Sequence, residues 1–334
     1  MGRRCDLGRL RRIGAEHVAR AGASNTDRAY LGHWRRWVAW CERHGFGVSP
    51  VRGEVVVLYL TYLGERRYAE STVRGALAAI RHGALIREGA RNGSMAVEVG
   101  RCLRSVCRLV ARAADRSSPL RAGRLAELVG LVEGYRATGV WQGAGKVPVW
   151  LREMEGRRWA RDKALLLMGW GMAWRRSELA GMDWESVNFV EGGVLVHLSR
   201  SKRDQLARGT WTGVEVGSGA ATCPVAALAA WQAACGKRSG AVWRGLDRWG
   251  HMRGRMSDRG IGLVVQRYGG LVARDGDVFS AHSLRAGWAT DMLALGVPEP
   301  VVMGHMRHRD KSMLRVYYRP EGFLRGGLVG RAGL

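Results

Sequence analysis

The chain has 334 residues, 46% of them hydrophobic, which suits two globular domains with cores of their own and excludes a disordered chain. Its 54 Lys and Arg against 29 Asp and Glu give a net charge of +25, which favours nucleic acid over a membrane surface as the partner. We find neither an apolar run of about 20 residues nor a secretory leader. The six cysteines form no CxxC pair and no zinc-ligand spacing, so an intracellular, reduced protein is expected.

Helical periodicity organises the first third of the chain. Residues 1–22 are rich in arginine and predict a basic N-terminal arm. Four helices are predicted after it, starting at Ser24 and spanning about 24–41, 53–68, 71–90 and 98–114. Residues 115–123 contain a Ser-Ser-Pro break and predict a linker. We therefore expect an all-α domain over 23–114 and a second domain over 124–334 that ends in a short C-terminal tail.

Two of these helices carry arginines that are candidates for DNA binding. The third helix has an apolar face made of Val73, Leu77, Ile80 and Ala84, and also carries Arg74 and Arg81. The fourth places an arginine stripe opposite Val99, Cys102, Val106 and Leu109; the stripe consists of Arg101, Arg104, Arg108 and Arg112. A charged stripe is often only a solvated face. This one has a single sign, so no i,i+4 ion pair offsets its repulsion, and phosphate contact is an equal alternative.

The second domain mixes helices with one β-hairpin. Two β-branched runs over 193–216, on either side of a polar turn near Lys202–Gly209, predict the hairpin. Helices are predicted at 124–135, 159–172, 223–236, 256–269, 282–295, 298–306 and 310–318, with caps such as Ser257 and a stop at Gly236. The expected fold class is mainly α with a small β-hairpin or sheet (α+β).

Five short motifs then follow one another along the second domain. They are WRRSEL, SKRDQ and HSLR, a histidine 23 positions after Arg285 (285 to 308), and a tyrosine nine positions further on (308 to 317). None is specific alone, but their order and spacing resemble the tyrosine recombinase (phage integrase) family. The resemblance covers most of the chain. It implies a helical core-binding domain at SNTDRAYLGHWRRWVAWC and STVRGALAAI, and a catalytic domain from about residue 119 onward.

The chemistry of a phosphodiester explains these residue types. The transition state gathers negative charge on the non-bridging oxygens, which arginine forks can bind in two-point contacts. The resemblance implies that Arg175, Arg285 and His308 supply these donors and that Tyr317 attacks phosphorus to form a 3′-phosphotyrosine. It also implies that His282 accepts the phenol proton and that Lys202 protonates the leaving 5′-oxygen. No metal, ATP or other cofactor is expected.

The pairing of histidine and tyrosine leaves alternatives open. The spacing typical of the family pairs His308 with Tyr317, which makes His305 a helix-surface residue and Tyr318 a packing or DNA-backbone neighbour. The family usually has glycine before this histidine, whereas here the residue is Arg307 and the Gly-His pair is Gly304-His305. His305 therefore stays a candidate.

The first motif, WRRSEL, contains two adjacent arginines, and the family pattern contains one of them. Counting back from Ser177-Glu178-Leu179 selects Arg175 rather than Arg176. Glu178 is expected to hold the arginine's helix or hairpin in place, not to act as a base. A metal site made of the three histidines 282, 305 and 308 is a minor alternative, because no carboxylate or cysteine ligand accompanies them.

The resemblance implies a site-specific DNA recombinase or integrase that acts on double-stranded DNA. It further implies a homo-oligomer, with two protomers on each site and four in the synapse, associated with DNA inside the cell. No membrane or small-molecule partner is expected. Two alternatives remain: a type IB topoisomerase-like enzyme that relaxes supercoils, and a DNA-binding relic of a mobile element with a decayed site.

Overall fold

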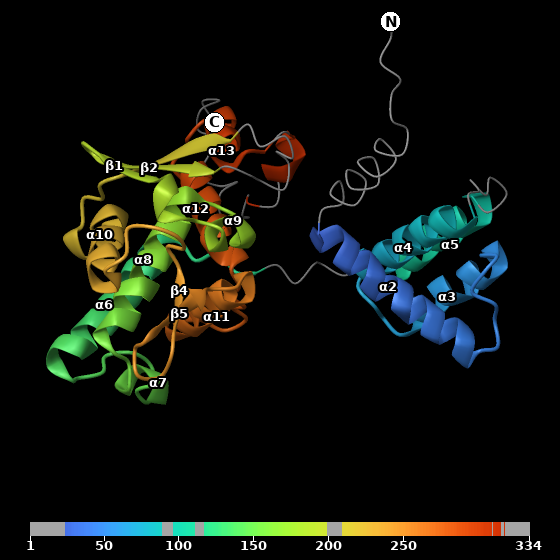
Figure 1. Ribbon diagram of the computed structural model, residues 1–334, viewed down its shortest axis with the longest axis horizontal. Coiled ribbons are helices and arrows are strands. Elements are labelled where there is room, and N and C mark those ends of the chain that lie inside the picture. The colour runs from blue at the N-terminus through green and yellow to red at the C-terminus, as the bar shows by residue number, and fades with distance from the viewer. Residues whose placement is uncertain are drawn as a thin grey trace, which may run out of the picture. The chain divides into compact units, whose positions relative to one another are not determined.

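The computed structural model describes residues 24–88, 96–110, 117–198, 209–308, 310–314 and 317. The chain divides into two compact units, Met1–Asp115 and Arg116–Leu334, which are described separately (Figure 1). The predicted basic arm, the turn with Lys202, Arg112, Tyr318 and the C-terminal tail lie outside the described residues.

The first unit is built from helices. They are α2 (Ser24–Arg43), α3 (Gly53–Glu65), α4 (Glu70–Glu88) and α5 (Ala96–Leu109). Helix α2 packs on α4 and α3 packs on α5. The predicted apolar face of α4 is confirmed, because Val73, Leu77, Ile80 and Ala84 are all buried. Around them an aromatic group of Trp37, Trp40 and Tyr59 fills the core, with ring centroids 5.1–6.0 Å apart.

Helix α5 has the amphipathic pattern that its sequence predicts, with one error. Its buried side includes Val99 and Val106, while Arg101, Arg104 and Arg108 are exposed. Leu109 was assigned to the apolar face, and this is wrong, because 49% of its surface is exposed. At 3.6 residues per turn Leu109 falls on the flank between the two faces, and Val110 takes the buried position beside it.

The second unit surrounds one buried helix, α8 (Gly156–Met172). Helix α8 packs against α10 (Pro224–Cys235) and α12 (His282–Ala294), as Figure 1 shows. Its second half, ALLLMGWGM over 164–172, has no charged residue on any side, as a helix segment enclosed by others requires. The remaining helices are α6 (Ala122–Thr138), α7 (Val149–Arg152), α9 (Arg176–Ala180), α11 (Asp258–Gly269) and α13 (Glu299–Met306).

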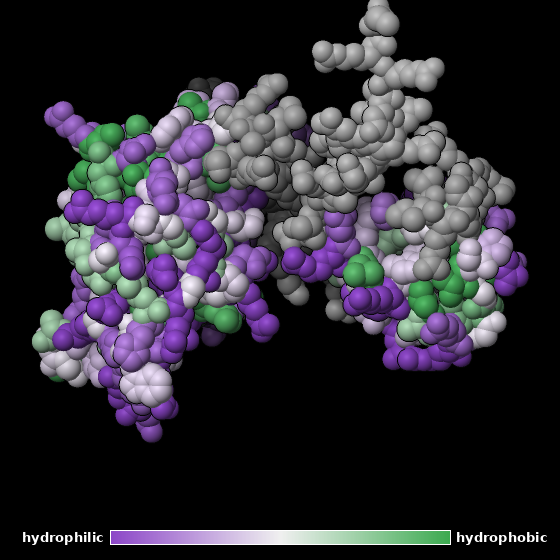
Figure 2. All heavy atoms as spheres, viewed as in Figure 1, coloured by the Kyte–Doolittle hydropathy of each residue, from purple (hydrophilic) through white to green (hydrophobic). Residues whose placement is uncertain are grey.

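Two small antiparallel sheets complete this unit. The larger has the order β1 (Val187–Val190), β2 (Gly193–Leu198), β3 (Thr210–Glu215), with Val196 opposite Thr212. The smaller pairs β4 (Arg244–Leu246) with β5 (Met252–Arg255). Strands β2 and β3 confirm the predicted hairpin, and the fold class, mainly α with a small sheet, is confirmed. Figure 2 shows a hydrophobic patch over β1 and β2, where Phe189, Val190 and Leu195 are exposed.

Boundaries follow the predicted caps in several places. Ser257 accepts a hydrogen bond from the Gly260 amide at 3.1 Å, and Gly236 ends α10 at a φ of 63°. A helix was predicted at 310–318, but within it the structure describes a short 3-10 turn at Lys311–Leu314. In the described ranges, the helices are all too short or too polar to cross a membrane.

The described part of the predicted linker is packed. Leu120 is fully buried, and its amide donates to the Ser283 carbonyl at 2.9 Å. The Ser117 and Ser280 hydroxyls lie 2.7 Å apart. Residues 117–121 therefore lie against the start of α12, and this contact helps to position the helix that carries the HSLR motif.

Candidate active site

Helix α12 presents two of the predicted site residues. His282 and Arg285 lie three positions apart in its first turn and share a face. The helix is closely seated, because a Cβ added at Gly287 would lie 1.9 Å from the Leu120 carbonyl oxygen. Glycine at this position lets the α12 backbone approach residue 120, and the place of Arg285 is fixed as a result.

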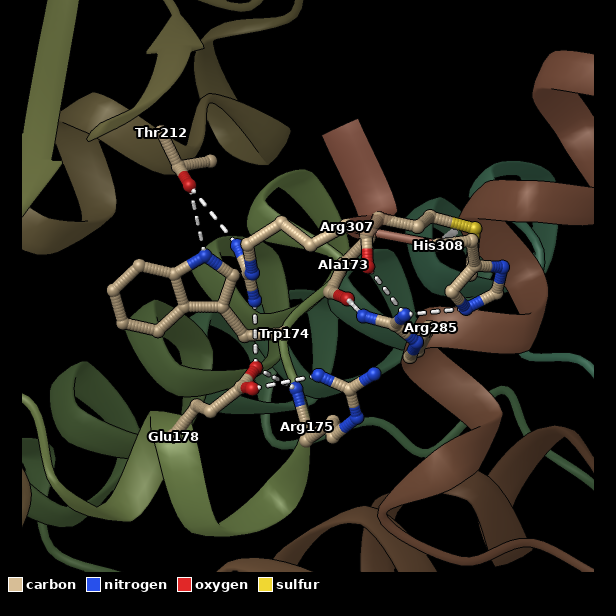
Figure 3. A network of polar contacts seen from close by, with 9 residues as sticks. Ala173, Trp174, Arg175, Glu178, Thr212, Arg285, Arg307 and His308 are labelled. Atoms are coloured by element: carbon tan, nitrogen blue, oxygen red, sulfur yellow. Dashed lines mark hydrogen bonds and ion pairs between the residues drawn. The ribbon is translucent and has the colours of Figure 1, made fainter. Parts of the chain in front are cut away.

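Arg285 is buried, with 2% of its surface exposed. Its guanidinium donates to the main-chain carbonyls of Ala173 and Met306, the latter at 2.7 Å, and lies 2.7 Å from His308 Nε2 (Figure 3). Burial and the neighbouring charge of Arg175 lower the pKa of Arg285 to about 10, against an opposing contribution from Tyr317. The side chain therefore stays charged at neutral pH, and two backbone acceptors hold it in place.

Arg175 immediately precedes the short helix α9. Its side chain donates to Glu178 Oε1 at 2.8 Å, and its own amide donates to Glu178 Oε2 at 2.9 Å. Glu178 thus holds the arginine, as its sequence position indicated. Arg176, the alternative in the first motif, points elsewhere and pairs with Asp258 at 3.0 Å on the surface.

Glu178 is only 5% exposed and also accepts from Arg307 Nη2 at 2.6 Å. Burial raises the pKa of this carboxyl, but Arg307 and Arg175 outweigh burial and lower it. Glu178 is consequently a carboxylate at neutral pH and cannot serve as a proton donor there.

Tyr317 lies between two of the predicted histidines. Its hydroxyl is 3.4 Å from His282 Nε2, and its ring stacks on His308 at a centroid distance of 6.1 Å and an angle of 17°. Tyr317 is 5% exposed, whereas His282 reaches the surface. Partial burial of the imidazole and the charges of Arg285 and Arg175 lower the pKa of His282, so its ring is neutral at pH 7 and able to accept a proton.

His305 lies in a different environment. Its Nε2 is 2.9 Å from the Gly171 carbonyl oxygen, and its ring stacks on Trp288 at 4.2 Å. It is half-buried, so its assignment as a helix-surface residue is wrong; the reason is that α13 packs this side against α8 and α12. Of the two histidines, His308 is the one that lies against Tyr317 and Arg285. Nowhere in the described ranges do three His, Cys, Asp or Glu side chains gather as metal ligands would.

The predicted DNA-binding arginines belong to the first unit. Arg81, Arg101, Arg104 and Arg108 are exposed, and Arg74 is exposed but paired with Glu70 at 2.7 Å. No sequence motif indicates a role for Arg307, Thr212 or Trp174. Figure 3 shows Arg307 joined to Glu178, and Thr212 joined to both Arg307 and Trp174. The only sequence signal for Arg307 was that it stands where the family usually has glycine.

The second unit is mainly helical and brings two arginines, two histidines and a tyrosine together, as the resemblance to the tyrosine recombinases leads one to expect. The chain belongs to the phage integrase family, whose model matches residues 151–322. It is also similar to a curated protein, the integrase/recombinase xerD homolog of Selenomonas ruminantium, with 27% identity over 316 residues that cover 94% of this chain and 87% of that protein.

Solved structures share the fold at low sequence identity. The Tn1549 transposon integrase in complex with transposon right end DNA matches with a TM-score of 0.56 and 13% identity, over 95% of this chain and 98% of that one. A lambda integrase dimer bound to a core site matches with a TM-score of 0.54 and 15% identity, over 92% and 93%. XerH recombinase in a post-cleavage complex matches with 0.53 and 14%, over 80% and 69%.

Proposed function

We propose that this chain breaks and rejoins double-stranded DNA at specific sites, with Tyr317 as the nucleophile. One observation carries the assignment: the Tyr317 hydroxyl lies 3.4 Å from His282 Nε2, beside the ring of His308, which contacts Arg285. A phenol with a pKa near ~10 needs a proton acceptor and a cationic surrounding to attack at neutral pH. This arrangement supports both needs.

In the proposed step, one phosphate ester replaces another. The bond from the Tyr317 oxygen to phosphorus forms while the bond from phosphorus to the 5′-oxygen breaks, leaving a 3′-phosphotyrosine. The phenol proton passes to His282, and Lys202 gives a proton to the 5′-oxygen. Attack by a 5′-hydroxyl on the phosphotyrosine reverses the step and rejoins the strand. The ester bond is conserved throughout, so ATP has no part in the proposed step.

The positive side chains would carry the charge of the transition state. They come from three separate segments: Arg285 contacts His308, the His308 ring lies against Tyr317, and the charge of Arg175 is near enough to lower the pKa of Arg285. Positioned donors of this kind stabilise the developing oxyanion charge and require no reorganisation during the reaction. Because the arginines supply this charge, the proposed step uses no metal ion.

We extend the proposal to the DNA complex. The exposed arginines of α5, the net charge of +25 and the relatives solved on DNA support duplex DNA as the partner. The helical unit, proposed over 23–114, would bind one side of the duplex, with Arg101, Arg104 and Arg108 facing phosphates. The catalytic domain, proposed over 124–334, would bind the other. A dimer on each site and a tetramer in the synapse are proposed by analogy with the lambda integrase dimer on its core site.

A nicked suicide substrate tests the nucleophile. The purified chain would be incubated with a library of nicked duplexes, and protein joined to DNA would be detected on a denaturing gel. Wild type should give a covalent band, Tyr317→Phe none, and Tyr318→Phe a band of wild-type intensity. A band lost only in Tyr318→Phe would overturn the assignment of Tyr317. Binding without any covalent band in wild type, over the whole library, would contradict the proposed enzyme. Sequencing the trapped DNA would identify the site.

A further inference from the structure

Arg307 has a main-chain conformation that is unfavourable for its residue type. Its φ of 55° and ψ of 45° lie in the left-handed region, where a Cβ crowds the following carbonyl and glycine is usual. The Arg307 amide donates to the Gly304 carbonyl at 3.1 Å, and the His308 amide reaches back to the Met303 carbonyl at 2.9 Å. This pair of bonds ends α13 and turns the chain so that His308 faces Arg285.

The Arg307 side chain connects this turn to two other elements. Its Nη2 donates to Glu178 Oε2 on α9 at 2.6 Å, and its Nη1 donates to the Thr212 hydroxyl on β3 at 3.3 Å. The guanidinium also lies over the Trp174 ring, 5.5 Å from its centroid. Trp174 in turn donates to Thr212 at 3.0 Å, as Figure 3 shows. The side chain is only 16% exposed, so these contacts are made away from solvent.

Each oxygen of the Glu178 carboxylate has an assigned donor. Oε1 accepts from Arg175 Nη1, whereas Oε2 is shared between the Arg175 amide and Arg307. Arg307 thereby fixes the orientation of the carboxylate, and the carboxylate fixes the Arg175 guanidinium. Paired, charge-assisted bonds of this kind define direction as well as energy. Without Arg307, Glu178 Oε2 would keep only the Arg175 amide as a donor. The buried carboxylate would then have Arg175 as its single cationic partner among these contacts.

We propose that Arg307 is a positioning residue, which orients Arg175 through Glu178 and ties the turn before His308 to α9 and β3. The proposal rests on the proposed function, since it assigns Arg307 to the same reaction. Arg307 itself does not touch the phosphate. Arg307 instead holds the segment of Arg175 and the segment of His308, which supply the phosphate-binding groups, in a fixed relative position. The main chain at Arg307 is strained as a consequence.

Arg307→Gly is the decisive variant, because glycine accepts the left-handed conformation and should keep the turn to His308. The chain offers a matched control in Arg67, which has a φ of 54° and belongs to the first unit. Arg67→Gly makes the same substitution at nearly the same positive φ. Arg307→Lys adds a conservative variant that keeps a cation near Glu178.

Two measurements distinguish a role of Arg307 in positioning Glu178 and Arg175 from a role in stabilising the fold alone. The first is the titration of the Glu178 carboxyl in the free protein, followed by carbon-13 NMR and assigned with Glu178→Gln. The charges that face this carboxyl are Arg175 before α9, Arg285 on α12 and Arg307 after α13. The pKa of Glu178 should rise in Arg307→Gly, because burial raises this pKa and one of the two positive charges that lower it is removed. It should stay unchanged in Arg67→Gly.

The second readout is the single-turnover rate of covalent complex formation on saturating nicked substrate. Arg307→Gly should be slower by about tenfold or more, with unchanged DNA affinity, and Arg307→Lys should recover part of the rate. A wild-type rate or an unshifted Glu178 titration in Arg307→Gly would overturn the proposal while leaving Tyr317 as nucleophile. An equal loss in Arg67→Gly would also overturn it. No covalent product from wild type would instead reject the proposed function, and this inference with it.

Discussion

Replacing Arg285 with lysine separates the charge of this residue from its geometry. The buried guanidinium donates hydrogen bonds to the Ala173 and Met306 carbonyls and also contacts His308. A lysine has one nitrogen on a flexible stem and cannot reach all three partners. At least one buried carbonyl would lose its donor, at a cost of about 1–3 kcal/mol in the free energy of unfolding.

The expected effect on cleavage is larger than this structural cost. Loss of one positioned donor to a transition-state oxygen lowers rates by about 10²–10³, or about 2.7–4 kcal/mol. The lysine would also lose charge. Burial and Arg175 already lower the pKa of Arg285 to about 10, and a lysine starts from a lower ordinary value of about 10.4. Part of the population would then be neutral at the pH of the reaction.

The assay is single-turnover cleavage of a nicked substrate with protein in excess, together with unfolding in urea. Arg136→Lys is the matched control, because Arg136 also donates to a main-chain carbonyl, that of Met154, at 3.1 Å. The control should lose only about 0.5–1.5 kcal/mol of stability and keep its cleavage rate. Arg285→Lys with a cleavage rate near that of wild type, or a control that slows equally, would refute the reasoning.

Three further predictions concern proton transfer, packing and DNA binding. The pKa of His282 is lowered, so a cleavage rate that depends on neutral His282 should stay constant as the pH falls to 6.5 and should decline only below that pH. A half-maximal rate above pH 6.5 would contradict the role of His282 as proton acceptor. An unchanged pH profile in His282→Gln would contradict it as well. Gly287→Ala should lower the free energy of unfolding in urea by about 3 kcal/mol or more, because the new methyl meets the Leu120 backbone. Gly130→Ala, in open space on α6, should instead raise it by about 0.5–1 kcal/mol, and equal effects would refute the packing argument. Arg104→Ala should weaken DNA binding on all sequences and reduce the slope of log affinity against log salt by about 1, whereas Arg74→Ala should change both less, since Glu70 already pairs with it.

Local patterns in the sequence determined most of the helices. Apolar residues recurring every three or four positions defined the buried face of α4, and the cap at Ser257 and the stop at Gly236 marked helix ends. These signals depend on neighbours a few positions apart, so one sequence contains them in full. The short strands β1, β4 and β5 escaped prediction, because three or four residues offer too little alternation to recognise.

The order and spacing of the motifs also predicted the site residues. Arg175, His282, Arg285, His308 and Tyr317 were selected by order and distance along the chain. Their roles stay predictions, and so do those of Lys202, Arg112 and Tyr318, which lie outside the described residues. The spacing shows that His305 and His308 both lie shortly before Tyr317, but it does not show what surrounds either histidine.

Only the tertiary structure decided those surroundings. His305 meets Gly171 and Trp288, while His308 meets Arg285 and Tyr317, although three positions separate the two histidines. Arg307 reaches Glu178 across more than a hundred residues of chain. Such contacts depend on how α9, α12 and α13 pack, and packing is the joint result of many buried side chains rather than a property of any short segment. The sequence by itself therefore determined the helices and the chemical groups, and the packing of distant helices determined which groups meet.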